Sequence, residues 1–405
     1  MAPYETDDST DTGEADELRS GRRRAARYIV PVTVVGVAAA TIGLVPALAD
    51  SGDPNLPKIT AQQLLDKVAK SDVQQLSGTV KISTDLGLPD LGGLGSSMLS
   101  GATKSGDGSS ADPTAKLTEL ATGSHTLRVA ADGPDKQKVS LLENAAEYSL
   151  IHNGKDVWGY DSQSNEVFHA TTSADTSKSD ETRATPKGLT DEALKSVDDT
   201  TSVTVDGTEH VAGRDAYKLL IKPKQSGTTV GTISIAVDAK TGLPLKFTLT
   251  PASGGAAVVD VGFTQLSLAK PAASTFDFKT PKGAKVTTED SPPKATPDHS
   301  APFGKNDKTD KGLGKGTDDP TVIGKGWNSI AVFETGGQGI PTGSSSGGGD
   351  LGGFLSSLGD QVKGSFGSGT VYSTRLINAL VTDNGKVYVG AVTKSALVKA
   401  ADAAK

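Results

Sequence analysis

The stretch from Val211 to Leu249 constrains the fold more than any other part of the chain, because its pattern is that of three consecutive strands. Apolar and polar residues alternate from Tyr217 to Lys222 and again from Thr232 to Val237, as in a strand with one buried face. Between the second and third strands, Asp238 to Gly242 is rich in residues that tolerate a positive φ, as turns require. The stretch therefore predicts an antiparallel meander.

Similar runs on both sides extend this meander to about eleven strands. The other predicted strands are Leu76 to Thr84, Ser124 to Ala131, Lys136 to Leu142, Glu147 to Asn153, Asp156 to Asp161, Asn165 to Thr171, Thr201 to Asp206 and Ala257 to Ser267. Two short helices are expected, Ala61 to Lys70 and Leu189 to Val197. The pattern contains no βαβ crossover, so it predicts a mainly β (α+β) fold in which a curved antiparallel half-barrel wraps short helices.

Composition limits the number of domains. The chain has 405 residues, of which 48 are Gly, 20 are Pro and only 35% are hydrophobic, so much of it is expected to be linker. We expect a large domain over residues 57–286 and a linker rich in Pro, Lys and Asp over residues 287–320. A small α+β domain is expected over residues 321–405, beginning with a strand from Trp327 to Phe333.

Charge and cysteine usage exclude several functions. A net charge of -7 and a pI near 5.4 argue against nucleic acid as a partner, because phosphate binding relies on clustered Lys and Arg. The chain has no cysteine, which excludes disulfides, thiol catalysis, iron–sulfur clusters and thiolate zinc sites. A lipid-modified N-terminal cysteine is excluded for the same reason.

The N-terminus has the pattern of an export signal. Residues 1–27 are polar and end in an arginine cluster, which predicts a cytoplasmic region, and residues 28–49 are apolar. The small residues Ala47 and Ala49 suit a signal peptidase, so one outcome is cleavage at Ala49 and secretion. The other outcome is a retained signal-anchor, because about 18 to 20 apolar residues span a bilayer as a transmembrane helix. Either outcome places the protein outside the cytoplasmic membrane, in the cell envelope or beyond.

Several segments together resemble a known superfamily. They are His125 to Val129, Asp132 to Pro134, Asn153 to Trp158, Val211 to Tyr217, Val237 to Pro244 and Phe276 to Ala284. In this order they are similar to the superfamily of the periplasmic lipoprotein carrier LolA. They are most similar to actinobacterial exported LolA-like proteins that resemble the N-terminal domain of the sigma-E regulator RseB (MucB). The resemblance covers roughly Pro57 to Val286.

This resemblance implies an unclosed barrel around helices, with an apolar cavity that takes acyl chains. It also implies a two-domain layout like that of RseB, whose small domain contacts an anti-sigma factor. The chain departs from the mycobacterial members that carry glycolipids, because those are lipoproteins and this chain has no cysteine. Any membrane tether is therefore expected to be the N-terminal helix.

Motifs for catalysis or cofactors do not occur in a structured context. The five histidines are dispersed and have no ligand spacing. Gly343 to Gly347 matches the nucleophile-elbow pattern, but it lies inside a Gly/Ser run. Gly312 to Thr317 lacks the spacing of a phosphate loop. We therefore expect a protein that is not an enzyme and that has no cofactor and no metal.

Two functions of different classes remain. The first is a lipid- or lipoprotein-binding carrier or sensor, whose partner is an acyl lipid or a lipidated protein. The second is a regulator resembling RseB/MucB, which contacts an anti-sigma factor or another membrane-bound protein of an envelope-stress pathway through its C-terminal domain. For the first, the apolar strand residues expected to line the cavity are Val129, Leu141, Ile151, Trp158, Phe168, Tyr217, Leu219, Ile233, Ile235, Phe247 and Phe263. Ordinary core packing is the alternative role of the same residues.

A Leu- and Gly-rich insertion from Asp85 to Ser110 interrupts the strand pattern. It is either a loop without a regular structure or a hydrophobic flap over the mouth of a ligand site. The residues of the candidate flap are Leu86, Leu88, Leu91, Leu94 and Met98.

Overall fold

The computed structural model describes residues 54–87, 109–113, 116, 120, 122–171, 185–195, 197–289, 321–334 and 359–404. The predicted cytoplasmic region and the signal or anchor helix, residues 1–49, lie outside these ranges. Four residues of the candidate flap also lie outside them, namely Leu88, Leu91, Leu94 and Met98. No helix in the described ranges is long and apolar enough to cross a membrane.

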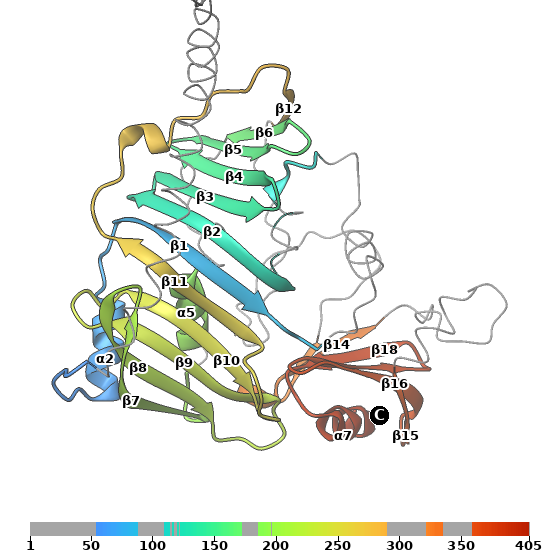
Figure 1. The fold of residues 1–405 in the computed structure, drawn as a ribbon. Coiled ribbons are helices and arrows are strands. Elements are labelled where there is room, and N and C mark those ends of the chain that lie inside the picture. The colour runs from blue at the N-terminus through green and yellow to red at the C-terminus, as the bar shows by residue number, and fades with distance from the viewer. Residues whose placement is uncertain are drawn as a thin grey trace, which may run out of the picture. The chain divides into compact units, whose positions relative to one another are not determined.

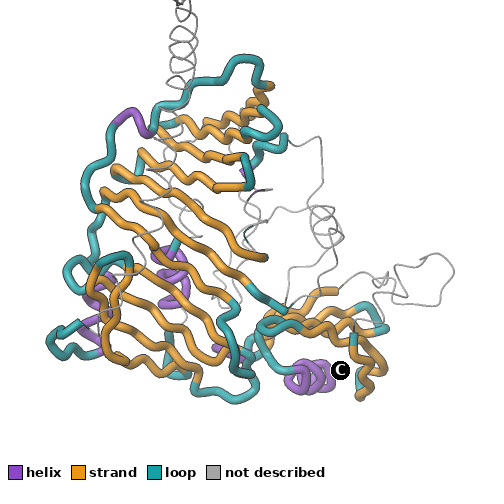
Figure 2. Tube along the Cα trace, viewed as in Figure 1, coloured by secondary structure: helices purple, strands orange, loops and turns teal. Residues whose placement is uncertain are grey.

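The largest element of the described residues is one curved sheet, which Figures 1 and 2 show as a continuous set of strands with few, short helices. Its strands are β1 (Gln75–Thr84), β2 (Gly123–Asp132), β3 (Lys136–Glu143), β4 (Ala146–Asn153), β5 (Asp156–Asp161), β6 (Glu166–Thr171), β7 (Thr201–Val211), β8 (Arg214–Pro223), β9 (Val230–Asp238), β10 (Pro244–Pro251), β11 (Val259–Ser267) and β12 (Lys285–Glu289). They lie in the order β12-β6-β5-β4-β3-β2-β1-β11-β10-β9-β8-β7, so the sheet is not closed. The predicted mainly β fold with an unclosed sheet is confirmed.

The eleven predicted strands correspond to β1 to β11, and β12 is an addition. β12 pairs with β6 in parallel, which corrects the expectation of a purely antiparallel sheet. That expectation assumed that a parallel strand needs a helical crossover. Here the connection from β11 to β12 is residues 268–284, which contain only a single short 3-10 helix, η2 (Ala273–Thr275). A tight hairpin joins β4 and β5, with Gly154 and Lys155 as its loop and Asn153 paired with Asp156.

One face of the large sheet, here called the inner face, is apolar along most of its width. Residues directly opposite each other on neighbouring antiparallel strands share a face, so the register identifies its members. From β6 to β1 the consecutive partners are Phe168, Gly159, Leu150, Val139, Val129 and Gly78. From β11 to β7 they are Val261, Phe247, Ile235, Leu219 and Val205.

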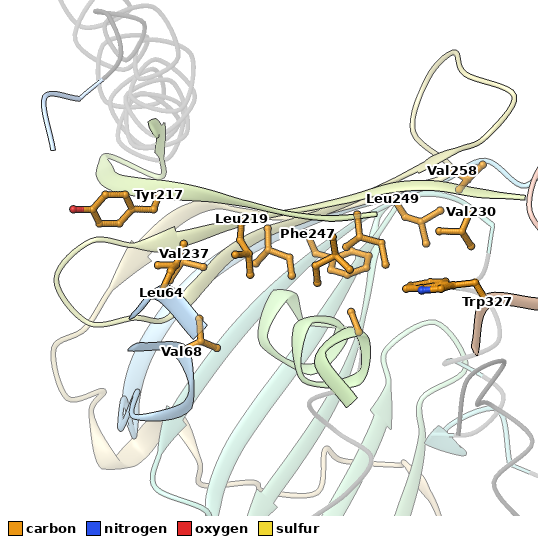
Figure 3. Packing of buried hydrophobic residues seen from close by; sticks show 14 of the residues in the cluster. Leu64, Val68, Tyr217, Leu219, Val230, Val237, Phe247, Leu249, Val258 and Trp327 are labelled. Carbon is orange, nitrogen blue, oxygen red and sulfur yellow. The ribbon is translucent and has the colours of Figure 1, made fainter. Parts of the chain in front are cut away.

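Two helices cover the inner face between β7 and β11. α2 (Ala61–Ala69) begins at a capping box in which Thr60 and Gln63 exchange hydrogen bonds, and it buries Leu64 and Val68. α5 (Pro186–Lys195) buries Ala193 and begins at Pro186 rather than at the predicted Leu189, because proline is favoured in the first turn. Figure 3 shows apolar side chains of the strands pointing from the sheet toward both helices.

The C-terminal residues form a separate, six-stranded sheet. Its strands are β13 (Thr321–Ile323), β14 (Ile330–Glu334), β15 (Asp360–Gly364), β16 (Gly367–Ser373), β17 (Asn378–Thr382) and β18 (Lys386–Gly390), in the order β13-β14-β18-β17-β16-β15. α7 (Lys394–Ala403) packs on one face through Leu397 and Ala401. Trp327 lies in the 3-10 helix η3 (Gly326–Asn328), so the predicted strand from Trp327 begins only at Ile330.

The small sheet contacts the large one through side-chain and backbone hydrogen bonds and a shared apolar cluster. Trp327 is buried in the same cluster as Leu219, and its indole N–H donates to the Thr201 hydroxyl at 2.9 Å. The backbone N–H of Arg375 donates to the carbonyl of Leu86 at 2.8 Å, and Leu86 is the one candidate flap residue that is described. These contacts make residues 53–405 one compact unit.

Candidate functional site

The inner face brings together nine of the eleven apolar residues that the sequence singled out. They are Val129, Leu141, Phe168, Tyr217, Leu219, Ile233, Ile235, Phe247 and Phe263, and each is at most 8% exposed. Ile151 and Trp158 lie on the opposite face, because they pair with each other while Gly159, the residue next to Trp158, pairs with Phe168. A ligand on the inner face would therefore not touch Ile151 or Trp158. It would also have to displace the groups that bury the other nine.

In the half of the inner face between β7 and β10, the predicted residues are part of a helix-covered core. Tyr217, Leu219, Ile233, Ile235 and Phe247 belong to one buried cluster with Leu64 and Val68 of α2, Ala193 of α5 and Trp327. The Tyr217 hydroxyl donates to the carbonyl of Pro57 at 2.9 Å. Figure 3 shows Leu219 and Phe247 pointing from the sheet to the side on which Leu64 and Val68 lie. This half is packed as an ordinary core.

The turn between β9 and β10, in the helix-covered half, is held by an ion pair whose carboxylate, that of Asp238, is buried. The guanidinium of Arg214 donates to Asp238 through Nε at 2.6 Å and through Nη2 at 3.2 Å. The second carboxylate oxygen also accepts from the N–H groups of Lys240 and Thr241. Burial alone would raise the pKa of Asp238, but Arg214 and Thr241 together hold it below the ordinary range. The pair has a structural role.

In the half of the inner face between β1 and β6, a short turn from Ser109 to Asp112 lies on the sheet. The Asp112 N–H donates to the Ser109 carbonyl at 3.0 Å, and Ala111 is fully buried in a small cluster with Phe168 and Ala170. The hydroxyl of Tyr148 donates to the Ala111 carbonyl at 3.1 Å. The backbone of the turn therefore lies directly over β4, β5 and β6.

Glu166 at the start of β6 holds this turn. Its Oε2 accepts hydrogen bonds from the Ser110 N–H at 2.8 Å, the Ser110 hydroxyl at 2.9 Å and the Ser109 hydroxyl at 3.0 Å. Its Oε1 accepts from Lys285 of β12 at 3.1 Å. The Ser110 N–H, followed by Lys285 and the serine hydroxyls, lowers the pKa of Glu166 to about 2. The carboxylate is therefore charged at neutral pH and joins two segments that are distant in sequence.

Lys116 adds a charged group beside the same turn. Its Nζ lies 2.9 Å from Glu143 and 3.9 Å from Asp161, and 5.9 Å from the centre of the Tyr148 ring. Two carboxylates balance its charge. Lys116 therefore fixes the position of the chain after the turn and is not available as a binding site for an anionic headgroup.

The opposite face of β5 and β6 carries an aromatic cluster. Trp158 stacks on His169 with ring centres 3.8 Å apart, and Phe278 lies 5.2 Å from Trp158 and 6.0 Å from Tyr160. Phe276 is fully buried, and its carbonyl accepts from the Asn153 amide at 3.3 Å. These contacts fasten the connection between β11 and β12 to the sheet, and this is the role of Trp158 in the structure.

Sequence reasoning missed the Ser109–Asp112 turn and Glu166. One signal for them exists in the sequence, because Gly159 interrupts an otherwise bulky strand and an isolated glycine in a strand marks a close approach of backbone. The structure shows that approach, since a methyl group on Gly159 would clash with the Ala111 carbonyl oxygen. Over the described part of the chain, no three His, Asp or Glu side chains come together as metal ligands would.

The fold and the inner face define the class as a half-barrel with an apolar inner face. The model of the MucB/RseB N-terminal domain family matches residues 122–290. The chain thus resembles the superfamily that contains LolA-like and MucB/RseB proteins, as its motifs predict. A search of curated proteins found no match.

Three solved structures, among others, are similar to this chain at low sequence identity. The MucA/MucB complex of Pseudomonas aeruginosa is 15% identical, with 84% of this chain and 96% of that chain covered and a TM-score of 0.38. An uncharacterized conserved protein from Thermus thermophilus is 14% identical, with 56% and 99% covered and a TM-score of 0.31. A LolA superfamily protein from Nitrosomonas europaea is 12% identical, with 55% and 99% covered and a TM-score of 0.21.

Proposed function

We propose that the protein is a non-enzymatic, extracytoplasmic carrier or sensor that binds an acyl lipid, or the lipid of a lipidated protein, on the inner face between β1 and β6. The observation that carries the proposal is the contrast between the two halves of this face. The described helices pack mainly on β7 to β11, whereas β4 to β6 are covered by a turn that polar contacts hold at its edge. A ligand in this half would therefore meet a turn rather than a packed helix.

Apolar contacts alone are sufficient for binding of this kind. Burial of about 0.8 kcal/mol per methylene gives roughly 12 kcal/mol for a C16 chain before the costs of association. Three predicted residues lie in this half, namely Val129, Leu141 and Phe168, and Phe263 lies beside it on β11; all four are apolar. No charged group is required, which agrees with the pairing of Lys116 to two carboxylates.

Lipid extraction followed by mass spectrometry tests the proposal on purified residues 54–405. We expect a co-purifying acyl lipid, and a higher melting temperature when fatty acid or phospholipid is added to the delipidated protein. The absence of both would refute lipid binding.

A matched pair of variants tests the location of the site. Leu141→Ala and Leu219→Ala each remove a buried leucine side chain, from the β1–β6 half and from the helix-covered half respectively. Each change should cost about 2 to 5 kcal/mol of stability. We expect only Leu141→Ala to change the amount of bound lipid, and equal losses in both variants would contradict the assignment to the β1–β6 half.

A second function has its own observation, on the small sheet. Ala331, Val389, Ala379 and Tyr372 are consecutive partners in register on the face opposite α7, and all are half-buried. An apolar face of this kind suits a protein partner, and the match to the MucB/RseB family model supports a regulator of an anti-sigma factor or of an envelope-stress pathway. Val389→Asp should abolish recovery of such a partner in a pull-down while lipid binding is retained. Equal recovery by the variant and the parent chain would exclude this docking face.

The proposal includes export of the chain by residues 28–49 and a division into a domain over residues 57–286, a linker over residues 287–320 and a domain over residues 321–405. N-terminal sequencing of the mature protein from its host tests the first part. A new N-terminus at Asp50 would show cleavage after Ala49, and an intact Met1 in the membrane fraction would show a retained anchor. Intact protein in the cytosol would refute export.

A further inference from the structure

We propose that the Ser109–Asp112 turn is a built-in stop that fixes how far an apolar ligand extends along the inner face, with Glu166 as the residue that positions it. This inference rests on the proposed lipid-binding function and deepens it, because it says which structural element selects the length of the acyl chain. Three independent features support it, namely the place of the turn, its anchoring and the glycine beneath it.

The first feature is the place that the turn occupies. Ala111 is fully buried against Phe168 and Ala170, and its carbonyl accepts the hydrogen bond of the Tyr148 hydroxyl at 3.1 Å. Tyr148 and Phe168 lie on the same face as Val129 and Leu141, as the register shows. The turn therefore covers the end of the apolar row that otherwise continues from β1 to β6. Strands lie about 4.8 Å apart, so the turn takes up about 10 Å of the row over β5 and β6.

The second feature is the polar anchoring. Ala111 supplies the apolar contact, but the turn is held at the sheet edge by three hydrogen bonds to one oxygen of Glu166. Lys285 binds the other oxygen, so the anchor is also tied to β12. Hydrogen bonds are directional and are lost together when the turn moves, whereas apolar contacts weaken gradually. Such an anchor gives a stop a defined position.

The third feature is Gly159. It lies in the middle of β5 between Trp158 and Tyr160, where a strand normally has a bulky residue. A side chain at this position would clash with the Ala111 carbonyl oxygen and would lie 3.0 Å from the Tyr148 hydroxyl. The strand therefore has no side chain at the point where the turn crosses it, which indicates a specific seat for the backbone of the turn.

At the other side, the apolar row is closed by the helix-covered core. Leu64, Val68 and Trp327 fill the space over β7 to β10. The stretch between the two closures contains Val80, Leu127, Val129, Leu141 and Phe263, all buried in one cluster against which Leu120 and Leu189 also pack. We infer that the length of this stretch sets the length of the acyl chain that the site accepts in the parent protein.

The experiment measures the affinity of delipidated residues 54–405 for a series of saturated fatty acids of increasing length. In the parent chain, affinity should rise roughly four-fold per methylene and then stop rising at the length where the ligand meets the turn. In Glu166→Ala the rise should continue over several further methylenes. Glu166→Gln keeps an acceptor oxygen and loses the charge. In this variant, the fatty-acid length at which affinity stops rising should lie between the lengths found for the parent chain and for Glu166→Ala.

Two further variants keep the experiment decisive. Tyr148→Phe removes only the hydroxyl that holds the Ala111 carbonyl, and it replaces Glu166→Ala if the latter does not fold. Asp260→Ala is the control, because Asp260 pairs with Lys246 on the opposite face and should leave the limit unchanged. Hydrogen exchange of the Ser110 and Asp112 amides reports on the turn independently of any lipid, and it should accelerate in Glu166→Ala.

The outcomes separate the inference from the function on which it rests. If the parent chain binds no fatty acid of any length, the lipid-binding function fails and the inference fails with it. If the parent chain binds but its length limit is the same in Glu166→Ala and Tyr148→Phe while amide exchange accelerates, the turn is not a stop and the inference alone is overturned. A uniform loss of affinity at all lengths would likewise show that Glu166 has only a structural role.

Discussion

The two halves of the inner face are built from the same alternating strands but are closed in different ways. Between β7 and β10 the closure consists of two helices whose apolar side chains interlock with those of the strands, including Leu64 and Phe247. Between β4 and β6 the closure is the Ser109–Asp112 turn, held by Glu166 and Tyr148. The comparison teaches that an apolar sheet face does not by itself define a binding site. Whether a ligand can bind there depends on how strongly the protein groups that cover the face are held.

The physical difference lies in what must be lost when each closure opens. Opening the helix-covered half exposes a large cluster of buried side chains, at about 25 cal/mol for each Å² of apolar surface. Opening the β4–β6 half exposes Ala111, Phe168 and Ala170 and breaks hydrogen bonds whose groups can be solvated at the sheet edge. The second half should therefore open at a lower free energy.

The largest effect is expected at the buried ion pair of the helix-covered half. Asp238→Ala removes the partner of Arg214 and the acceptor of the turn N–H groups at Lys240 and Thr241. Breaking a buried pair from one side should lower the free energy of unfolding by about 3 to 5 kcal/mol. Urea denaturation of residues 54–405, followed by far-UV circular dichroism, measures the change.

A surface pair provides the control for that measurement. Asp260→Ala breaks the contact with Lys246, in which both side chains are more than one third exposed. Its cost should stay below about 1 kcal/mol. If Asp238→Ala costs no more than Asp260→Ala, the ion pair does not stabilise the helix-covered half and the comparison loses its strongest support.

The next effect concerns the contact between the same turn and α2. Gly242 has a φ of +76°, and a methyl group there would clash with the carbonyl of Lys67 in α2. Gly254 has the same φ of +76° but nothing lies within 4 Å of such a methyl group. Gly254→Ala should cost about 1 kcal/mol from the backbone alone. Gly242→Ala should cost about 2 to 3 kcal/mol, because it adds a steric conflict.

The difference in stability loss between these two glycine variants measures the contribution of α2 packing on the sheet. Thermal unfolding of both variants in the same buffer gives that difference, since the backbone term cancels. Equal losses of stability in the two variants would mean that α2 can move away from residue 242 at little cost in free energy. The helix-covered half would then be as easy to open as the β4–β6 half.

Sequence patterns predicted the strands well, because alternation and turn residues are local signals. β1 to β11, the capping of α2 by Thr60 and the β4–β5 hairpin all follow from residues within a few positions of each other. β12 and the Ser109–Asp112 turn do not. β12 is a short exposed run that is ordered by pairing with β6, and the turn is ordered by Glu166, more than fifty positions away. Neither has a local pattern that indicates its partner.

The candidate site shows the same limit. Alternation placed nine apolar residues on one face, because the period of a strand decides the face once the register is known. Ile151 and Trp158 were chosen for their apolar character, and the register assigns them to the other face. β4 and β5 carry large side chains on both faces, since one face contacts the turn and the other contacts Phe278. Apolar character alone could not separate the two sets.

The smallest expected effect is the pH dependence of the anchor in the β4–β6 half. The pKa of Glu166 is lowered to about 2 in the folded chain, so its contribution to stability is fully present above its ordinary range near 4.5. That contribution is lost as the pH falls from about 4.5 toward about 2. Asp238 acts in the same direction in the other half, because its pKa is also lowered. The parent chain should therefore lose stability over this window, and Glu166→Gln should lose less.

Lys285→Ala sharpens this last test, because it removes one partner of Glu166 and leaves the turn itself in place. The Lys285 side chain is 74% exposed, so the variant should lose less than about 1 kcal/mol at neutral pH. Without the ammonium, the pKa of Glu166 should move part of the way back toward its ordinary range, and the acid transition should begin at a higher pH. NMR titration of the Glu166 carboxyl carbon measures the shift directly. An unchanged titration in Lys285→Ala would mean that β12 does not share the anchor, and that Glu166 holds the turn through the two serines alone.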